Sequence, residues 1–139
     1  MVFFTIIFLT ACTEKTNNDY TFKGESEHWE AEYAYRGTEL WGETNGKKTY
    51  SNEDSYEFVL LYKGPLEELS SMQKLEFAYK TILSGGSKTE EFTEPPREVR
   101  FTTSGASKSG AKVSEDEVIQ VNVKWDDFEE SFELHNKSK

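Results

Sequence analysis

The strongest constraint on this fold is an alternation of apolar and polar residues over residues 118–134. Every second residue before Asp126 is apolar, and after Asp127 the same period returns with Glu130 as its one exception. A period of two is typical of a β-strand with one buried face, because successive side chains point to opposite faces of a sheet. The pattern therefore predicts an antiparallel hairpin with Asp126-Asp127 as a two-residue turn.

The register of this hairpin follows from its turn, because the numbers of facing residues must sum to a constant. The pairs expected on the apolar face are Trp125 with Phe128, Val121 with Phe132, and Ile119 with Leu134. On the outer face Lys124 meets Glu129, an opposite-charge pair that favours the same register. Glu130 falls opposite Val123 on the apolar face, where a carboxylate must be paired or lie at an open end of the sheet.

Similar alternation predicts further strands, separated by turn signals such as Asn45-Gly46, Gly64-Pro65 and Gly85-Gly86. These strands are expected in residues 27–36, 55–63, 74–82 and 98–103. With about six or seven short strands and almost no helical period, the fold class is all-β, and we expect an antiparallel β-sandwich. A small antiparallel barrel is the alternative. Residues 37–52 are interpreted as a turn-rich connection, in which Leu40-Trp41 and Thr49-Tyr50 can flank the Asn45-Gly46 turn as a short hairpin. Residues 104–112 are interpreted as a mobile loop.

The composition excludes both a disordered chain and several classes of partner. The chain of 139 residues has 3 Trp, 7 Tyr and 10 Phe, which are too many aromatic residues for a solvated tail. Its formal net charge is −10, and no charged residue lies before Glu14. An acidic domain of this kind disfavours nucleic acid and anionic lipid headgroups as partners, and it favours solubility, cations or a basic partner.

The N-terminal segment has the anatomy of an export signal. Residues 2–9 are almost all apolar, and they are too few to span a bilayer as a helix. Small residues follow, and the run ends at Cys12, which is the only cysteine of the chain. A lone cysteine in an exported protein cannot form an internal disulfide, so it requires another role.

The residues Leu9-Thr10-Ala11-Cys12 resemble the lipobox of bacterial lipoproteins. This resemblance implies that residues 1–11 are a signal peptide, removed by a dedicated peptidase. It also implies that Cys12 carries a diacylglycerol with palmitate-type acyl chains. The mature chain would then be anchored to the cell membrane on its extracytoplasmic face. Residues 12–21 are interpreted as the lipidated cysteine and a flexible polar tether, and residues 22–139 as the β-sandwich domain.

The C-terminal segment carries a second resemblance. A strand that ends in Trp125, a tight polar turn, and a return strand with Glu130, Phe132 and Leu134 resemble the ending of small Gram-positive lipoproteins of unassigned function. This likeness covers about 20 residues, and it implies no activity.

Motifs for catalysis, metals and cofactors are weak. Ser-x-x-Lys occurs twice, but without the helix and the further motifs that a serine acylase needs. His28 and His135 are the only histidines, both expected on wet faces, and the Asp126-Asp127 turn lacks the glycine-bearing loop of a calcium site. We therefore expect no catalytic residue, no metal and no cofactor.

Binding is the expected role. Trp41 and Tyr50 lie in the expected connection, where aromatic side chains can be exposed, and Glu130 is the third candidate. The expected function is a lipid-anchored, non-catalytic binding or envelope-interaction module, with an unidentified protein or small ligand as partner. The alternative is an envelope enzyme or accessory subunit, with a carboxylate-based site where Glu130 meets a His or a second carboxylate. Assembly through an unpaired strand edge is a third hypothesis.

Overall fold

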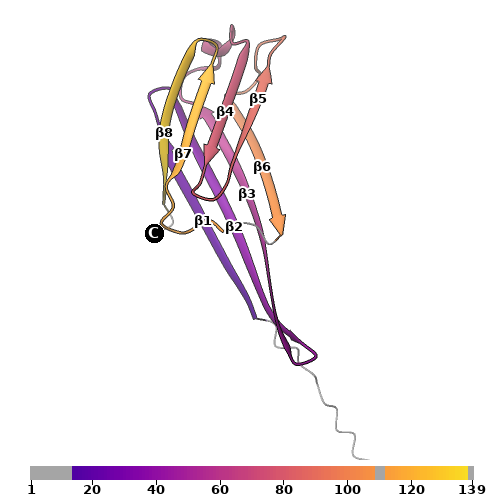
Figure 1. Ribbon diagram of the computed structural model, residues 1–139. Helices are drawn as coiled ribbons and strands as arrows, with labels where there is room; N and C mark the ends of the chain where they lie inside the picture. The colour runs from indigo at the N-terminus through magenta and orange to yellow at the C-terminus, as the bar shows by residue number, and fades with distance from the viewer. Residues whose placement is uncertain (1–13, 109–111, 138–139) are drawn as a thin grey trace, which may run out of the picture.

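The computed structural model describes residues 14–108 and 112–137. Within these residues the chain forms eight antiparallel strands in one sheet, in the order β5-β4-β7-β8-β1-β2-β3-β6 (Figure 1). The strands are β1 (Glu14–Glu25), β2 (Trp29–Thr44), β3 (Lys47–Tyr62), β4 (Lys74–Lys80), β5 (Gly85–Glu91), β6 (Arg100–Lys108), β7 (Ile119–Trp125) and β8 (Phe128–Asn136), with a single 3-10 turn, η1 (Leu66–Leu69), after β3. No helix among the described residues has the length and apolarity needed to cross a membrane.

The sheet folds over on itself, which confirms the all-β antiparallel class. Its two four-stranded halves are joined where β1 meets β8, through only two residue pairs, Phe22 with Asn136 and Lys23 with His135. At the other side the free edges approach each other, and Lys88 Nζ on β5 donates a hydrogen bond to the Thr102 carbonyl oxygen on β6 at 3.0 Å. The architecture is therefore an antiparallel sandwich that is nearly closed into a barrel.

Aromatic side chains from the two halves form the core between them. Ring centroids lie 5.7 Å apart for Phe58 and Phe77, and 5.5 Å apart for Trp29 and Trp125. Because each pair takes one ring from each half, these contacts hold the two layers together. Rings of this size each bury about 150–250 Å² and dominate the hydrophobic stabilisation of a small domain.

The C-terminal hairpin has the predicted register on both faces. Trp125 pairs with Phe128, and Val123 pairs with Glu130. The turn residue Asp126 has a φ of 51°, a left-handed conformation that Asn and Asp tolerate. Its carboxylate also accepts hydrogen bonds from the backbone N–H groups of Gln73 and Lys74, at 3.0 and 3.1 Å. These bonds give a reason for Asp at a turn position where Asn or Gly is commoner.

The expected tether is wrong over residues 14–21, and the expected connection contains more strand than predicted, because residues of both belong to long strands. The short hairpin expected around Asn45-Gly46 is confirmed, with Trp41 opposite Tyr50. Residues 14–21 form the first part of β1, and β2 and β3 continue to a turn at Asn45-Gly46 with φ values of 53° and 78°. Together these strands form an arm that extends beyond the body of the sandwich (Figure 1). Most side chains near its end are exposed, so backbone pairing stabilises it without an apolar face. Cys12 and Thr13 lie outside the described residues.

Two further segments differ from the sequence-based expectation. Residues 104–108, expected in a mobile loop, belong to β6 and pair with β3, while residues 109–111 are outside the described part. Gly85 and Gly86, expected in a turn, begin β5, and the turn lies at residues 81–84. The described chain therefore has eight strands instead of six or seven.

Candidate functional site

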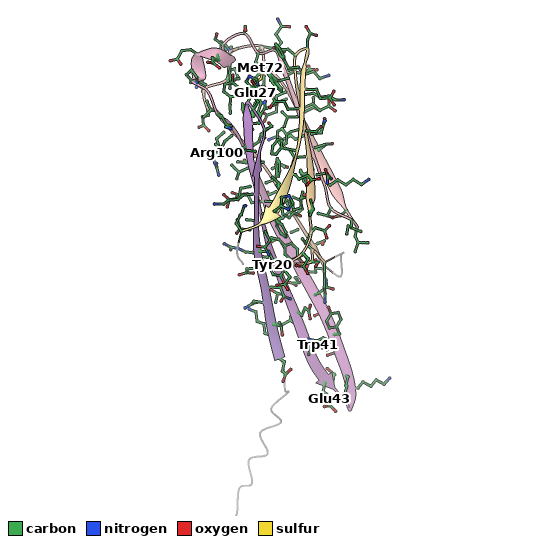
Figure 2. All side chains as sticks on the ribbon, turned by 90° about the vertical axis from the view of Figure 1, so that its left-hand side faces the viewer. Tyr20, Glu27, Trp41, Glu43, Met72 and Arg100 are labelled. Carbon is green, nitrogen blue, oxygen red and sulfur yellow. The ribbon has the colours of Figure 1, made fainter. Side chains whose placement is uncertain are left out.

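The molecule is elongated, and the candidate residues lie at different places along it. Figure 2 places Glu27 and Met72 near one end, and Trp41 and Glu43 at the opposite end, on the arm. Of the three sequence-predicted binding residues, the structure brings Trp41 and Tyr50 together and keeps Glu130 apart from them.

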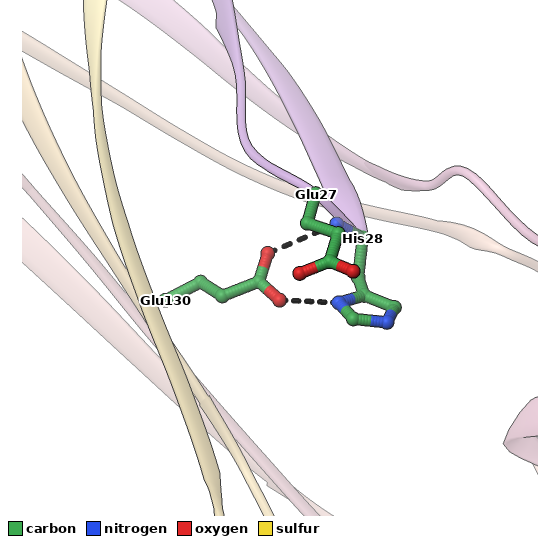
Figure 3. A group of neighbouring side chains, drawn as sticks. All are labelled: Glu27, His28 and Glu130. Atoms are coloured by element: carbon green, nitrogen blue, oxygen red, sulfur yellow. Dashed lines mark hydrogen bonds and ion pairs between the residues drawn. The ribbon is translucent and has the colours of Figure 1, made fainter.

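Glu130 is on β8, and its side chain contacts the residues that connect β1 to β2. Its side chain is 17% exposed and accepts hydrogen bonds from Ser26 Oγ at 2.5 Å and from the His28 backbone N–H at 3.0 Å. It also pairs with His28 Nδ1, as Figure 3 shows. The expectation that this carboxylate must be paired is confirmed. His28, expected as an ordinary surface histidine, is 43% exposed but takes part in this pair.

The pair shifts both protonation equilibria toward the charged forms. Burial pushes the pKa of Glu130 up, but the hydrogen bonds from Ser26 and His28 outweigh it, so the pKa lies below the usual 4.5. The hydrogen bond with Glu130 raises the pKa of His28 above 6.5, against a smaller opposite effect of burial. The cluster therefore ties β8 to the β1–β2 connection with a charge-assisted contact.

The same cluster offers limited chemistry. Ligand atoms of Glu27, His28 and Glu130 lie within 4.8 Å of one another, which is close enough for a divalent cation. A cation there would compete for the Glu130 carboxylate with Ser26 and His28, which already donate hydrogen bonds to it. The Ser26 hydroxyl donates to Glu130 and not to the His28 ring, so the residues do not form a relay that activates a serine nucleophile.

Trp41 and Tyr50 face each other across the arm. Their ring centroids are 4.4 Å apart, and the residues are 47% and 44% exposed. Lys112 Nζ lies 5.3 Å from the centre of the Tyr50 ring and pairs with Glu39. This ion pair, together with the hydrogen bond to Tyr50, raises the pKa of Lys112. The arm therefore presents an aromatic pair to solvent, beside a lysine that is held in place.

Sequence reasoning missed a third site, a cavity of about 230 Å³ between β2, β3, β4 and β6, which Gly85 borders at the start of β5. Four tyrosines line it together with Asp54, namely Tyr33, Tyr35, Tyr56 and Tyr79. Burial raises the pKa of Tyr35 to about 12, and its hydroxyl group interacts with Asp54 and with the Val113 backbone. The hydroxyl groups of Tyr56 and Tyr79 form a hydrogen bond of 2.5 Å. Burial also raises the pKa of Tyr33 and of Tyr79, so these two hydroxyl groups and that of Tyr35 are neutral at physiological pH.

Glycines opposite two of these rings make room for them. Tyr79 pairs with Gly86 on β5, and Tyr56 pairs with Gly105 on β6. A Cβ atom would come within 2.3 Å of the Tyr79 hydroxyl oxygen at the first glycine, and within 2.7 Å of the Tyr56 ring at the second. A side chain at either position would collide with a tyrosine that lines the cavity.

Asp54 is the unusual member of this cavity. It is only 8% exposed, and its Oδ2 atom has no hydrogen-bond partner among the described residues. A signal in the sequence points to it, because the alternation of β3 extends backward from Phe58 through Tyr56 to Asp54 on the inward face. The expected start of the strand at Ser55 concealed that position.

Comparison with known protein families, with curated proteins and with solved structures gave no match.

Proposed function

We propose that this protein is a lipid-anchored binding module on the extracytoplasmic face of the cell membrane, without a catalytic role. The residues Leu9-Thr10-Ala11-Cys12 supply the anchor in this proposal, with Cys12 carrying a diacylglycerol. The arrangement of Ser26 supports a non-catalytic role, because its hydroxyl group is bonded to Glu130 and is not activated by His28.

One observation carries the proposal, namely the pairing of Glu14 with Trp41 on the arm. Cys12 is two residues before Glu14, so the Cα atoms of these residues lie at most about 7 Å apart. From Trp41, β2 runs three more residues to Thr44, a rise of about 10 Å. A lipid on Cys12 would therefore bring the tip of the arm to the headgroup region.

The chemistry of the tip suits that location. Trp and Tyr are enriched at membrane–water interfaces, where an apolar ring and a polar edge are both accommodated. Lys47 and Lys48 give the tip two positive charges beside the single negative charge of Glu43. The rest of the domain is acidic, so anionic lipids would repel it and leave its far end free for a partner.

The anchor is tested by replacing Cys12 in the full chain expressed in a Gram-positive host. We expect the chain without substitutions to incorporate an alkyne-tagged fatty acid and to sediment with membranes after a high-salt wash. Cys12→Ala should lose the label and appear in the soluble fraction, whereas the neighbouring Thr13→Ala should behave like the unmodified chain. Equal labelling and sedimentation of Cys12→Ala would contradict the anchor.

The alternative function is an envelope enzyme or accessory subunit with a carboxylate-based site around Glu130. The observation in its favour is that Glu130 meets His28, the type of partner that this hypothesis requires. It predicts that the full chain hydrolyses a member of a panel of envelope-type ester, amide and glycoside substrates. The activity should vanish in Glu130→Gln and persist in Glu129→Gln, and unchanged turnover by Glu130→Gln would exclude this role.

A further inference from the structure

A buried carboxylate with an unsatisfied oxygen defines the cavity between the tyrosines. Asp54 is the single charged residue among the described residues that line it. Burying a carboxylate is strongly unfavourable unless it is paired or fully hydrogen-bonded. The Tyr35 hydroxyl group interacts with this carboxylate, but Oδ2 receives no hydrogen bond from the described residues. Asp54 lines this cavity, and its Oδ2 atom, which is itself almost fully covered, is an acceptor that a cationic donor would satisfy on reaching it.

The nearby lysines are already committed elsewhere. Lys112 pairs with Glu39, and Lys108 lies 3.7 Å from Glu53. The tyrosine hydroxyls are also partly engaged, since Tyr56 and Tyr79 bond each other. These contacts leave Asp54 without a basic side chain of its own in this cavity.

The size and walls of the cavity restrict what could enter. A volume of about 230 Å³ corresponds to about seven water molecules at their share of liquid volume. Tyrosine rings favour cations, through the attraction between a positive charge and the π-face. Ser84 and Gly85 are exposed and lie among the lining residues, so the cavity is bordered by surface. A small organic cation meets all of these conditions.

The state of Oδ2 distinguishes between types of organic cation. A quaternary ammonium has no N–H group and would leave this oxygen unsatisfied. A primary ammonium has three donors, one for Asp54 and the others for hydroxyl or carbonyl oxygens at the wall. We propose that the tyrosine cavity binds the primary ammonium group of a small organic amine. This inference rests on the proposed binding role, for which it names a ligand class, but it does not depend on the lipid anchor.

The test is a titration of the full chain in mild detergent with n-propylammonium, followed by calorimetry and by backbone amide chemical shifts. We expect saturable binding, with the largest shifts at Tyr33, Gly105 and Val113. The neutral isostere 1-propanol and tetramethylammonium should each bind at least tenfold more weakly. Failure to saturate, or equal affinity for 1-propanol, would overturn the inference without the need for a variant.

Two variants assign the binding to the carboxylate. Asp54→Asn should weaken n-propylammonium binding at least tenfold, because it removes the negative charge and keeps the shape. Its matched control is Glu57→Gln, which removes an exposed carboxylate three positions away on the same strand and should leave affinity unchanged. Equal affinity in a folded Asp54→Asn chain would contradict the assignment. If that variant does not fold, the comparison of the three probes on the unmodified chain decides.

The anchor and the ligand can fail separately. The full chain with Cys12→Ala should bind n-propylammonium with the affinity of the unmodified chain. A membrane-anchored chain that binds no amine would overturn the ligand class alone. A chain that binds the amine but carries no lipid would overturn the anchor alone.

Discussion

Glu130 is the residue at which the hydrophobic pattern of the C-terminal hairpin is interrupted, and its contacts explain the interruption. A carboxylate opposite Val123 would be unfavourable if it were unpaired, but Ser26 and His28 provide three hydrogen bonds. The residue therefore fixes the β1–β2 connection against β8. Asp54 is the opposite case, because one of its oxygens has no partner among the described residues.

Replacing Glu130 should destabilise the fold. Glu130→Gln removes the charge that Ser26 and His28 hydrogen-bond, and we expect the free energy of unfolding in urea near pH 6 to fall by about 1–3 kcal/mol. Glu129→Gln, at an exposed position on the same strand, should change it by less than about 0.5 kcal/mol. Equal effects of the two substitutions would show that the contacts of Glu130 contribute no stability.

The contribution of this pair should depend on pH in a defined direction. The raised pKa of His28 means that its contribution is fully present below pH 6.5 and is lost as pH rises through the folded-state value. The lowered pKa of Glu130 means that its contribution is present above pH 4.5 and is lost as pH falls through the folded-state value.

The difference in unfolding free energy between the unmodified chain and Glu130→Gln should therefore be largest between pH 4.5 and 6.5. Urea unfolding at a series of pH values measures this difference. A difference that grows steadily above pH 6.5 would have the wrong sign for a His–Glu pair.

The strands differ in how well their positions and pairing could be predicted from the sequence. The register of β7 and β8 is readable because one face is buried, so a slip by one residue would expose Ile119 and Leu134. The first half of β1 has no such face. Its residues from Glu14 to Asn17 are exposed, and only pairing with β2 makes them a strand. Polar composition there is indistinguishable from that of a tether.

The candidate sites, like the strands, could be predicted only in part from the sequence. The pairing of Trp41 with Tyr50 could be anticipated from the Asn45-Gly46 turn, and the need of Glu130 for a partner from its place in the hairpin. Its actual partner, His28, is about a hundred residues away in the chain, and no local pattern connects the two. The tyrosine cavity depends on contacts between four strands, which a single sequence does not reveal.

The junction of β1 with β8 makes a specific prediction for Gly24. A Cβ atom at this position would lie 1.9 Å from the Glu133 carbonyl oxygen, which belongs to the backbone and cannot move aside. We expect Gly24→Ala to lower the unfolding free energy by about 1–3 kcal/mol, as overpacking does. Gly42→Ala, on the arm, meets only the side-chain oxygen of Thr49 and should have a smaller effect. Equal losses for both would contradict a close-packed junction.

The whole molecule has two chemically different ends. The arm carries an exposed aromatic pair and two lysines. The far end carries Glu27, which belongs to the cluster around Glu130 (Figure 2). An anchor on Cys12 would join the arm to the membrane and direct the far end outward. The tyrosine cavity belongs to the body of the sandwich, since its tyrosines include core residues that contact both layers.

This orientation predicts that Trp41 contacts lipid. In vesicles that contain a phospholipid with a shallow nitroxide quencher, we expect the lipidated chain to lose part of its tryptophan fluorescence. Trp29 and Trp125 are buried, so most of the quenching should come from Trp41. Trp41→Phe should remove that quenching, whereas Tyr50→Phe should keep it. Equal quenching with and without Trp41 would place the arm away from the membrane.

The central claim is that the mature chain begins at an acylated Cys12, and intact mass spectrometry of protein extracted from membranes tests it most directly. The account predicts a mass equal to residues 12–139 plus a diacylglycerol, with fragmentation that locates the lipid on the N-terminal cysteine. A membrane-extracted chain that retains residues 1–11, or that begins elsewhere without a lipid, would contradict it.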